Sequence, residues 1–201
     1  MKNESSTDYS KPVGEIVAGS ISNFETQCHK LYETPALGSL VVSRDVTIAY
    51  GVVCEITTQS IDPGRRPVAL GKNEATVEQV YQRNPQLSKL LTTEFRSVVV
   101  GHKESSEILY YLAPRPPRIH SFVYLCDKNT LAEFSQSLDF IQVLLFSEIV
   151  SNDDVIASFI RQASVTHQDR EIFLINAGKE LAKLLSGQLP RLNSLLGRLS
   201  K

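Results

Sequence analysis

The sequence predicts an α+β protein: a small, closed or partly open β-barrel of about six strands with a helical insertion, followed by a C-terminal helical subdomain. Short β-type segments separated by Gly and Pro occupy the chain up to about residue 125. The clearest of them, Val46 to Thr57, alternates with a period of two, and a helical period begins after Thr130. Many short strands are typical of a barrel that closes to hide its edges.

The first strands are expected close to the start of this region. Gly14 to Phe24 is rich in small residues and predicts one strand that bends at Gly19. Leu40 to Ser43 predicts a second. Further strands are expected at 95–100, 108–112 and 119–125.

The third strand carries the strongest pattern. Between Val46 and Thr57, every second residue is apolar, which predicts a half-buried strand. The face expected to be buried comprises Val46, Ile48, Tyr50, Val52, Cys54 and Ile56. Gly51 would lie on the outer face, where it indicates a bulge or a close approach of a neighbouring backbone.

An insertion is expected between the third and fourth strands. Residues 62–93 are too many for a hairpin turn, and Val77, Val80 and Tyr81 give them a helical pattern of their own. Loops held by a rigid scaffold often carry function.

The last third of the chain predicts helices. Thr130 to Glu133 has the pattern of a capping box, and Ser151 to Asp154 is similar. Gly187 and Pro190 then interrupt the helical pattern. The final helix has a leucine stripe, which either faces the core or serves as a candidate partner helix: Leu192, Leu195, Leu196 and Leu199.

These patterns divide the chain into three parts. Residues 1–12 are polar and predict a flexible leader, 13–126 the barrel with its insertion, and 127–201 the helical region. Apolar runs such as Val143 to Phe146 are too short to cross a membrane. Three cysteines without a CxxC spacing suggest reduced, buried thiols, so we expect a soluble cytoplasmic protein.

The charge is nearly balanced overall, with 21 basic and 22 acidic residues. Residues 62–120 nevertheless hold nine basic and six acidic side chains. Four arginines of this region are a candidate polyanion contact, with a solvated loop surface as the alternative: Arg65, Arg66, Arg115 and Arg118.

Catalytic motifs are missing from the sequence. Gly64 and Gly71-Lys72 resemble a phosphate loop, but six residues separate the glycines and Asn73 follows the lysine, where a Ser or Thr is required. There is no HExxH, CxxC or GxSxG motif, and the four histidines are scattered. The sequence assigns no catalytic, cofactor or metal residue, and we expect a protein that is not an enzyme.

Three stretches have a distinctive order: Gly14-Glu-Ile-Val-Ala-Gly-Ser-Ile-Ser, Gly38-Ser-Leu-Val-Val with Ala49-Tyr-Gly-Val-Val-Cys-Glu-Ile, and Pro116-Pro-Arg-Ile-His-Ser-Phe-Val-Tyr124. Together they resemble the HAS-barrel, the domain shared by HerA-type DNA-translocating ATPases and rotary ATP synthase subunits. The resemblance spans roughly residues 12–126 and rests on glycines, β-branched residues and prolines. In that family a RecA-like ATPase follows the barrel, and the barrels crown a hexameric ring.

This chain departs from the family after the barrel, because helices replace the ATPase core. The resemblance therefore implies what a barrel alone can do: self-associate, dock to a partner or cap an assembly. We expect a non-catalytic assembly or adaptor module that binds a protein partner or its own copies through the barrel and the C-terminal helices. One alternative is a nucleic-acid-binding barrel in a HerA-type DNA-processing complex, with the four arginines on phosphates. The other is an enzyme whose site the sequence does not reveal.

Overall fold

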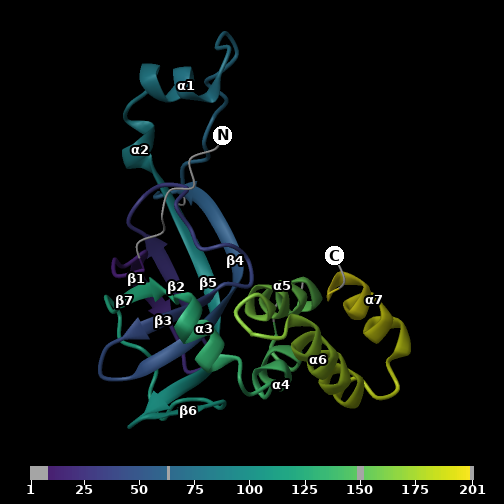
Figure 1. Ribbon diagram of the computed structural model, residues 1–201. Helices are drawn as coiled ribbons and strands as arrows, with labels where there is room; N and C mark the ends of the chain where they lie inside the picture. Colours follow the sequence, from purple (N-terminus) through teal and green to yellow (C-terminus); the bar gives the residue numbers. More distant parts are fainter. Residues whose placement is uncertain (1–8, 63, 149–151, 200–201) are drawn as a thin grey trace.

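A six-stranded antiparallel barrel and a layer of helices make up the fold, as the computed structural model shows for residues 9–62, 64–148 and 152–199 (Figure 1). The strands are β1 (Gly14–Gly19), β2 (Asn23–Cys28), β3 (Leu40–Arg44), β4 (Ile48–Ser60), β5 (Leu91–Glu104), β6 (Glu107–Leu109) and β7 (Phe122–Leu125). The barrel closes in the order β1-β2-β5-β4-β3-β7, with β7 pairing back to β1, and β6 adds to β5 as an extra strand. The predicted fold class is confirmed.

Seven helices accompany the strands in the described part of the chain. Two short ones, α1 (Val77–Arg83) and α2 (Leu87–Leu90), lie between β4 and β5. The other five follow the barrel: α3 (Lys128–Phe134), α4 (Phe140–Leu145), α5 (Asn152–Ser164), α6 (Arg170–Leu184) and α7 (Leu189–Leu199). Figure 1 shows α4 to α7 gathered on one side of the barrel, away from α1 and α2.

The first expected strand is in fact two. The chain turns at Ser20, where its amide donates to the carbonyl of Asn23 at 2.7 Å and its hydroxyl accepts from the Asn23 amide at 3.2 Å. A serine hydroxyl that binds nearby backbone groups favours a turn over a strand. The single strand predicted over Gly14–Phe24 is therefore wrong, and β2 was missed. The expected strand at 95–100 is longer, and those at 108–112 and 119–125 are shorter.

β4 is buried on both faces along its first half. Val53 packs inside the barrel, in a cluster with Phe24 and Phe95, whereas Tyr50 and Val52 belong to a second cluster with the helices. The prediction of a half-buried strand is wrong here, because the helical layer covers the outside of the barrel. The face that was expected to be buried points outward, towards the helices, and its first and last members, Val46 and Ile56, are exposed.

Gly51 lies at a bulge in the pairing of β4 with β5, as expected. It faces the barrel interior, however, and a Cβ there would lie 2.8 Å from the Phe24 ring. The close approach is therefore made by an aromatic side chain, and the glycine leaves room for it.

The helical layer is anchored by α5. Its residues Val155, Ile156, Phe159 and Ile160 are fully buried between the barrel and the other helices. Polar contacts fix the position of the layer, because Ser158 and Gln162 both donate to the carbonyl of Leu37, at 2.8 and 2.9 Å.

The helix starts differ from those expected. Asp127, not Thr130, caps α3, since its carboxylate accepts from the Thr130 amide at 2.8 Å. Ser151, the other expected cap, lies outside the described residues, as do residues 1–8 of the predicted leader and the end of the chain from residue 200. The interruption before α7 is present, with Gly187 at φ 86° and Pro190 in the first turn of the helix.

Candidate functional site

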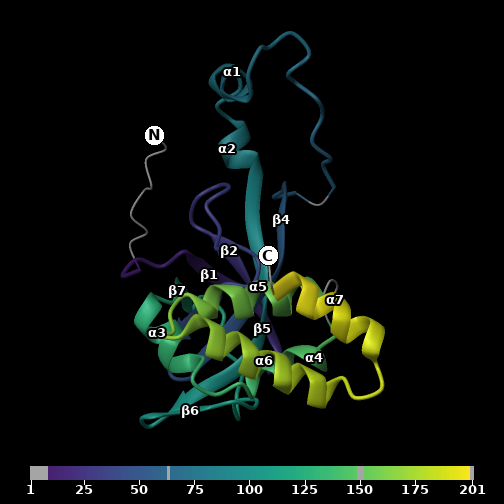
Figure 2. The same ribbon diagram turned by 45° about the vertical axis from the view of Figure 1, so that its right-hand side comes forward.

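The segment between β4 and β5, residues 61–90, projects from one end of the barrel, and we call it the arm (Figures 1 and 2). It is carried by the end of β4, where Glu55 to Ser60 are mostly exposed and, among the described strands, pair only with β5. The amide of Ile61 donates to the carbonyl of Leu90 at 2.9 Å, which closes the base of the arm.

Local contacts, rather than a core, order the arm. Neither α1 nor α2 contains a buried residue. Thr76 caps α1 by accepting from the Gln79 amide, and the guanidinium of Arg83 pairs with Glu74 at 2.5 Å. The helices are therefore held by local hydrogen bonds and an ion pair, while none of their apolar side chains is fully buried.

Tyr81 of α1 connects the arm to the barrel. Its hydroxyl lies 2.6 Å from the hydroxyl of Tyr32, in the loop after β2, and the two rings meet edge to face. This hydrogen bond raises the pKa of Tyr81 to about 12. The Tyr32 amide in turn donates to the Thr93 hydroxyl at 2.9 Å, so the contact reaches the barrel strand β5.

A groove of about 310 Å³ lies at the base of the arm, between the chain that leaves β4 and the helix that enters β5. Its apolar lining includes four large side chains that stay in water, with exposed fractions between 42 and 74%: Ile61, Val68, Leu70 and Leu90. The charged lining consists of Asp62, Arg65, Arg66 and Lys89. Three cations and one acid give the groove a net charge of +2.

The structure divides the four candidate arginines into two distant pairs. Arg65 and Arg66 line the groove, beyond the Ser60 end of β4. Arg118 and Arg115 lie between β6 and β7, and Arg118 reaches Asp45, just before the other end of β4. They do not form one polyanion surface.

Arg118 forms an ion pair with Asp45 of the β3–β4 turn. Its guanidinium donates to both carboxylate oxygens of Asp45, at 2.5 and 2.6 Å, and Ser121 donates to the same carboxylate at 3.0 Å. These hydrogen bonds hold the pKa of Asp45 well below its usual range. The pair connects the β3–β4 turn to the β6–β7 connection, which is a structural role.

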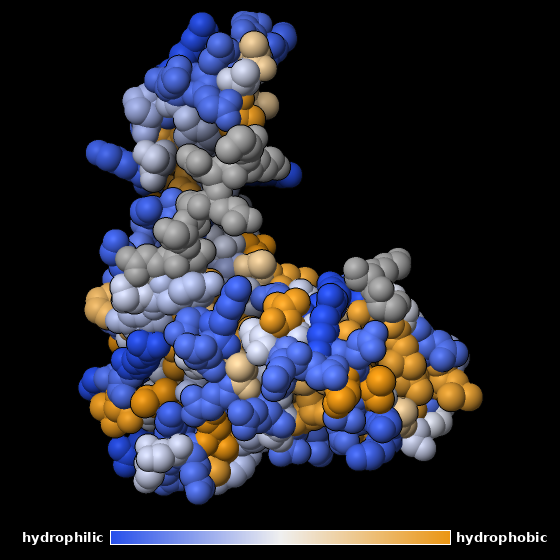
Figure 3. All heavy atoms as spheres, viewed as in Figure 1, coloured by the Kyte–Doolittle hydropathy of each residue, from blue (hydrophilic) through white to orange (hydrophobic). Residues whose placement is uncertain are grey.

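Three of the four leucines of the predicted partner helix are in the core. Leu192, Leu195 and Leu199 of α7 are 9, 0 and 5% exposed, and they pack with α5 and α6. Only Leu196 is exposed, at 37%. Other apolar side chains exposed on these helices include Ile172, Ile175 and Leu189, and Figure 3 shows hydrophobic surface at this end of the molecule.

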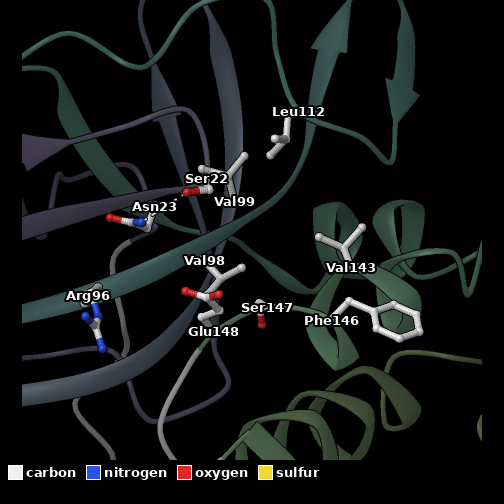
Figure 4. Close-up of a pocket in the computed structure, with 10 residues that line it drawn as sticks. All are labelled: Ser22, Asn23, Arg96, Val98, Val99, Leu112, Val143, Phe146, Ser147 and Glu148. Carbon is white, nitrogen blue, oxygen red and sulfur yellow. Dashed lines mark hydrogen bonds between the residues drawn. The ribbon is translucent and has the colours of Figure 1, made fainter. Parts of the chain in front are cut away.

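A second hollow, of about 470 Å³, lies between the barrel and α4 (Figure 4). Val143 and Phe146 line it from the helical side, and Asn23 and Arg96 from the barrel. Arg96 is already paired with Glu55 at 2.7 Å, and Glu148 is the other charged lining residue. With one charge of each sign, this hollow has no preference for an acidic or a basic ligand.

Two of the histidines that are scattered in the sequence converge on one carboxylate. Glu15 of β1 lies 3.5 Å from His29 and 3.1 Å from His120, each imidazole facing a different oxygen. Sequence spacing could not reveal this cluster, because barrel closure brings the three residues together. Among the described residues, however, no group of three or more His, Cys, Asp or Glu side chains is arranged to hold a metal ion.

The Ser135–His167 pair and the three cysteines are not accessible as nucleophiles. The hydroxyl of Ser135 lies 2.7 Å from His167 Nε2, but it donates to the Leu131 carbonyl and is only 1% exposed. All three cysteines are buried and free, and burial raises the pKa of Cys28 to about 11 and that of Cys126 to about 12. Such thiols are poor nucleophiles at neutral pH.

No family model and no curated protein matches this chain. In the part of the chain that the structure describes, none of the helices has the length and hydropathy needed to span a membrane.

Proposed function

We propose that this protein is a non-catalytic assembly or adaptor module, and that it docks to a protein partner through the arm groove. The observation that carries the proposal is an arm whose two helices contain no fully buried residue while four large apolar side chains line an open groove at its base. Ordering a segment costs conformational entropy, which burial of apolar surface normally offsets. A partner that covers the groove would supply that burial.

The resemblance of residues 12–126 to the HAS-barrel supports the same proposal, since barrels of that family work in assemblies. A six-stranded barrel is common to many classes of protein, so the architecture alone does not specify this family. The arm, rather than the leucine stripe of α7, is the surface we assign to docking, because most of that stripe is in the core.

Nucleic-acid binding remains the second candidate, carried by Arg65 and Arg66. None of the described residues that line the groove is aromatic, so bases have no ring to stack on there. The separation of the two arginine pairs also removes half of the expected phosphate contacts. A protein partner therefore fits the groove better.

Capture from a native extract with chemical crosslinking tests this proposal. The double variant Val68→Asp, Leu70→Asp puts charge into the groove at exposed positions, and Val46→Asp, at a position that is 77% exposed in the β3–β4 turn, is the matched control. We expect the double variant to lose specific protein partners that the wild type and Val46→Asp retain. Identical partner sets for all three proteins would refute docking at the groove.

A further inference from the structure

The charges around the arm groove indicate what kind of partner it takes. Arg65 pairs with Asp62 at 3.4 Å, but the two side chains are 78 and 59% exposed, and such pairs are weak. Arg66 and Lys89 form no ion pair with any other residue that the structure describes. Uncompensated cations at the rim of a groove attract acidic partners and repel basic ones.

The apolar lining sets a second requirement. Ile61, Val68, Leu70 and Leu90 offer an aliphatic surface, and a volume of about 310 Å³ is at the low end of the range for ligand pockets, about 300–1,000 Å³. A groove of this size accommodates a few anchoring side chains of a longer chain. The occupant must therefore combine acidic residues, for the rim, with large apolar residues, for the lining.

We infer that the arm groove binds an acidic segment of a partner protein, whose apolar side chains enter the groove while its carboxylates face Arg65, Arg66 and Lys89. This inference rests on the proposed function and adds the chemistry of the partner. The phosphates of an oligonucleotide could pair with the cations at the rim, but the aliphatic lining offers its bases no aromatic rings to stack on. A basic or neutral amphipathic segment could place apolar side chains in the groove but would not pair with the cations at its rim.

Selection from a random peptide library by the full-length protein tests the inference without presupposing a sequence. Each round is repeated on the variant Arg65→Glu, Arg66→Glu, Lys89→Glu, and on Arg115→Glu as the control, an exposed arginine between β6 and β7. We expect the wild type and the control to enrich peptides that carry both acidic and large apolar residues. The enriched peptides should bind the triple variant about tenfold more weakly or worse in fluorescence anisotropy.

The outcomes separate this inference from the proposed function. Enrichment of neutral or basic apolar peptides, whose binding is lost on Val68→Asp, Leu70→Asp but kept in the triple charge variant, would leave docking in place and overturn the acidic partner. Failure to enrich any peptide over the Val68→Asp, Leu70→Asp variant would overturn both. Circular dichroism melts of each variant establish that it is folded.

A single-stranded oligonucleotide of mixed sequence serves as the competing probe. Binding by the wild type that weakens steeply with salt and is lost in the triple charge variant, without any acidic peptide binding, would assign the cations to nucleic acid instead. We expect no such binding.

Discussion

The barrel and the arm are connected by the strands β4 and β5, yet apolar side chains are buried in the barrel and exposed in the arm. Within the barrel, Val53 and Phe95 are 0 and 1% exposed, and on the outer face Val52 is covered by the helices. A few residues further on, Ile61 and Leu90 are 54 and 45% exposed. The barrel completes its burial within one chain, whereas the arm leaves its apolar side chains available to a partner.

The largest difference between the two regions should appear on truncation of an aromatic ring. Phe24 is fully buried inside the barrel, so Phe24→Ala should lower the free energy of unfolding by about 3–5 kcal/mol, through lost contacts and a cavity. Val68→Ala in the arm should change it by less than about 0.5 kcal/mol. Urea denaturation measures the free energy of unfolding of both variants. A comparable loss of stability in the two would contradict the difference in burial between the barrel and the arm.

Two adjacent leucines of α7 provide the next comparison. Leu195 is 0% exposed and Leu196 is 37% exposed. Leu195→Ala should cost about 2–5 kcal/mol of stability, and Leu196→Ala less than about 1 kcal/mol. If instead Leu195→Ala left the melting curve unchanged and altered the mass in light scattering, α7 would be an association surface, not part of the core.

Thiol reactivity distinguishes the interior from the arm chemically. Because burial raises the pKa of Cys28 and Cys126, both should react slowly with iodoacetamide in the folded protein and quickly in denaturant. A cysteine introduced by Val68→Cys, at a 74% exposed position, should label fast. Rapid labelling of the native cysteines would mean that the interior opens easily.

The same thiols predict a pH dependence of stability. Their folded-state pKa values are raised from 9.0 to about 11 and 12, so the folded protein binds these protons more tightly than the unfolded chain does. The stabilisation is complete below about pH 9 and is lost as the pH rises through about 11 and 12. Urea midpoints across this range should fall less steeply in a Cys28→Ala, Cys126→Ala variant.

The smallest effect is expected at the tyrosine contact between the arm and the barrel. Tyr32→Phe removes the hydroxyl that raises the pKa of Tyr81, so the pKa of Tyr81 should fall from about 12 towards 10.0 in a phenolate absorbance titration. Stability should change by less than about 0.5 kcal/mol, since both side chains are on the surface. Tyr111→Phe, the control, should leave the titration of Tyr81 unchanged.

Much of the barrel could be predicted because strands and helices differ in their hydrophobic period. The alternation in β4 located the strand correctly but not its faces, since a strand buried on both sides gives no signal for which side is interior. Likewise, Thr130 and Asp127 are both acceptable caps in sequence, and only the backbone shows that Asp127 is used.

The arm groove could be predicted only in part. The excess of basic residues in 62–120 indicated Arg65 and Arg66, and the length of residues 62–93 predicted an insertion. The apolar lining combines Ile61, Val68 and Leu70 with Leu90, which the sequence separates by a helix and which meet only when the hairpin closes. Arg118 was wrongly predicted to contact a polyanion, because the sequence does not reveal its ion pair with Asp45, which is 73 residues away.

Replacing residues 62–89 by Asn-Gly tests most directly whether the barrel and its helices are stable without the arm. The hydrogen bond between Ile61 and Leu90 places these residues opposite each other, so a two-residue turn can close the β4–β5 hairpin. We predict that the shortened protein keeps its melting temperature within a few degrees and loses the partners that crosslinking captures with the wild type. A large loss of stability, or unchanged partner capture, would contradict the claim that the arm is a docking element added to a barrel complete without it.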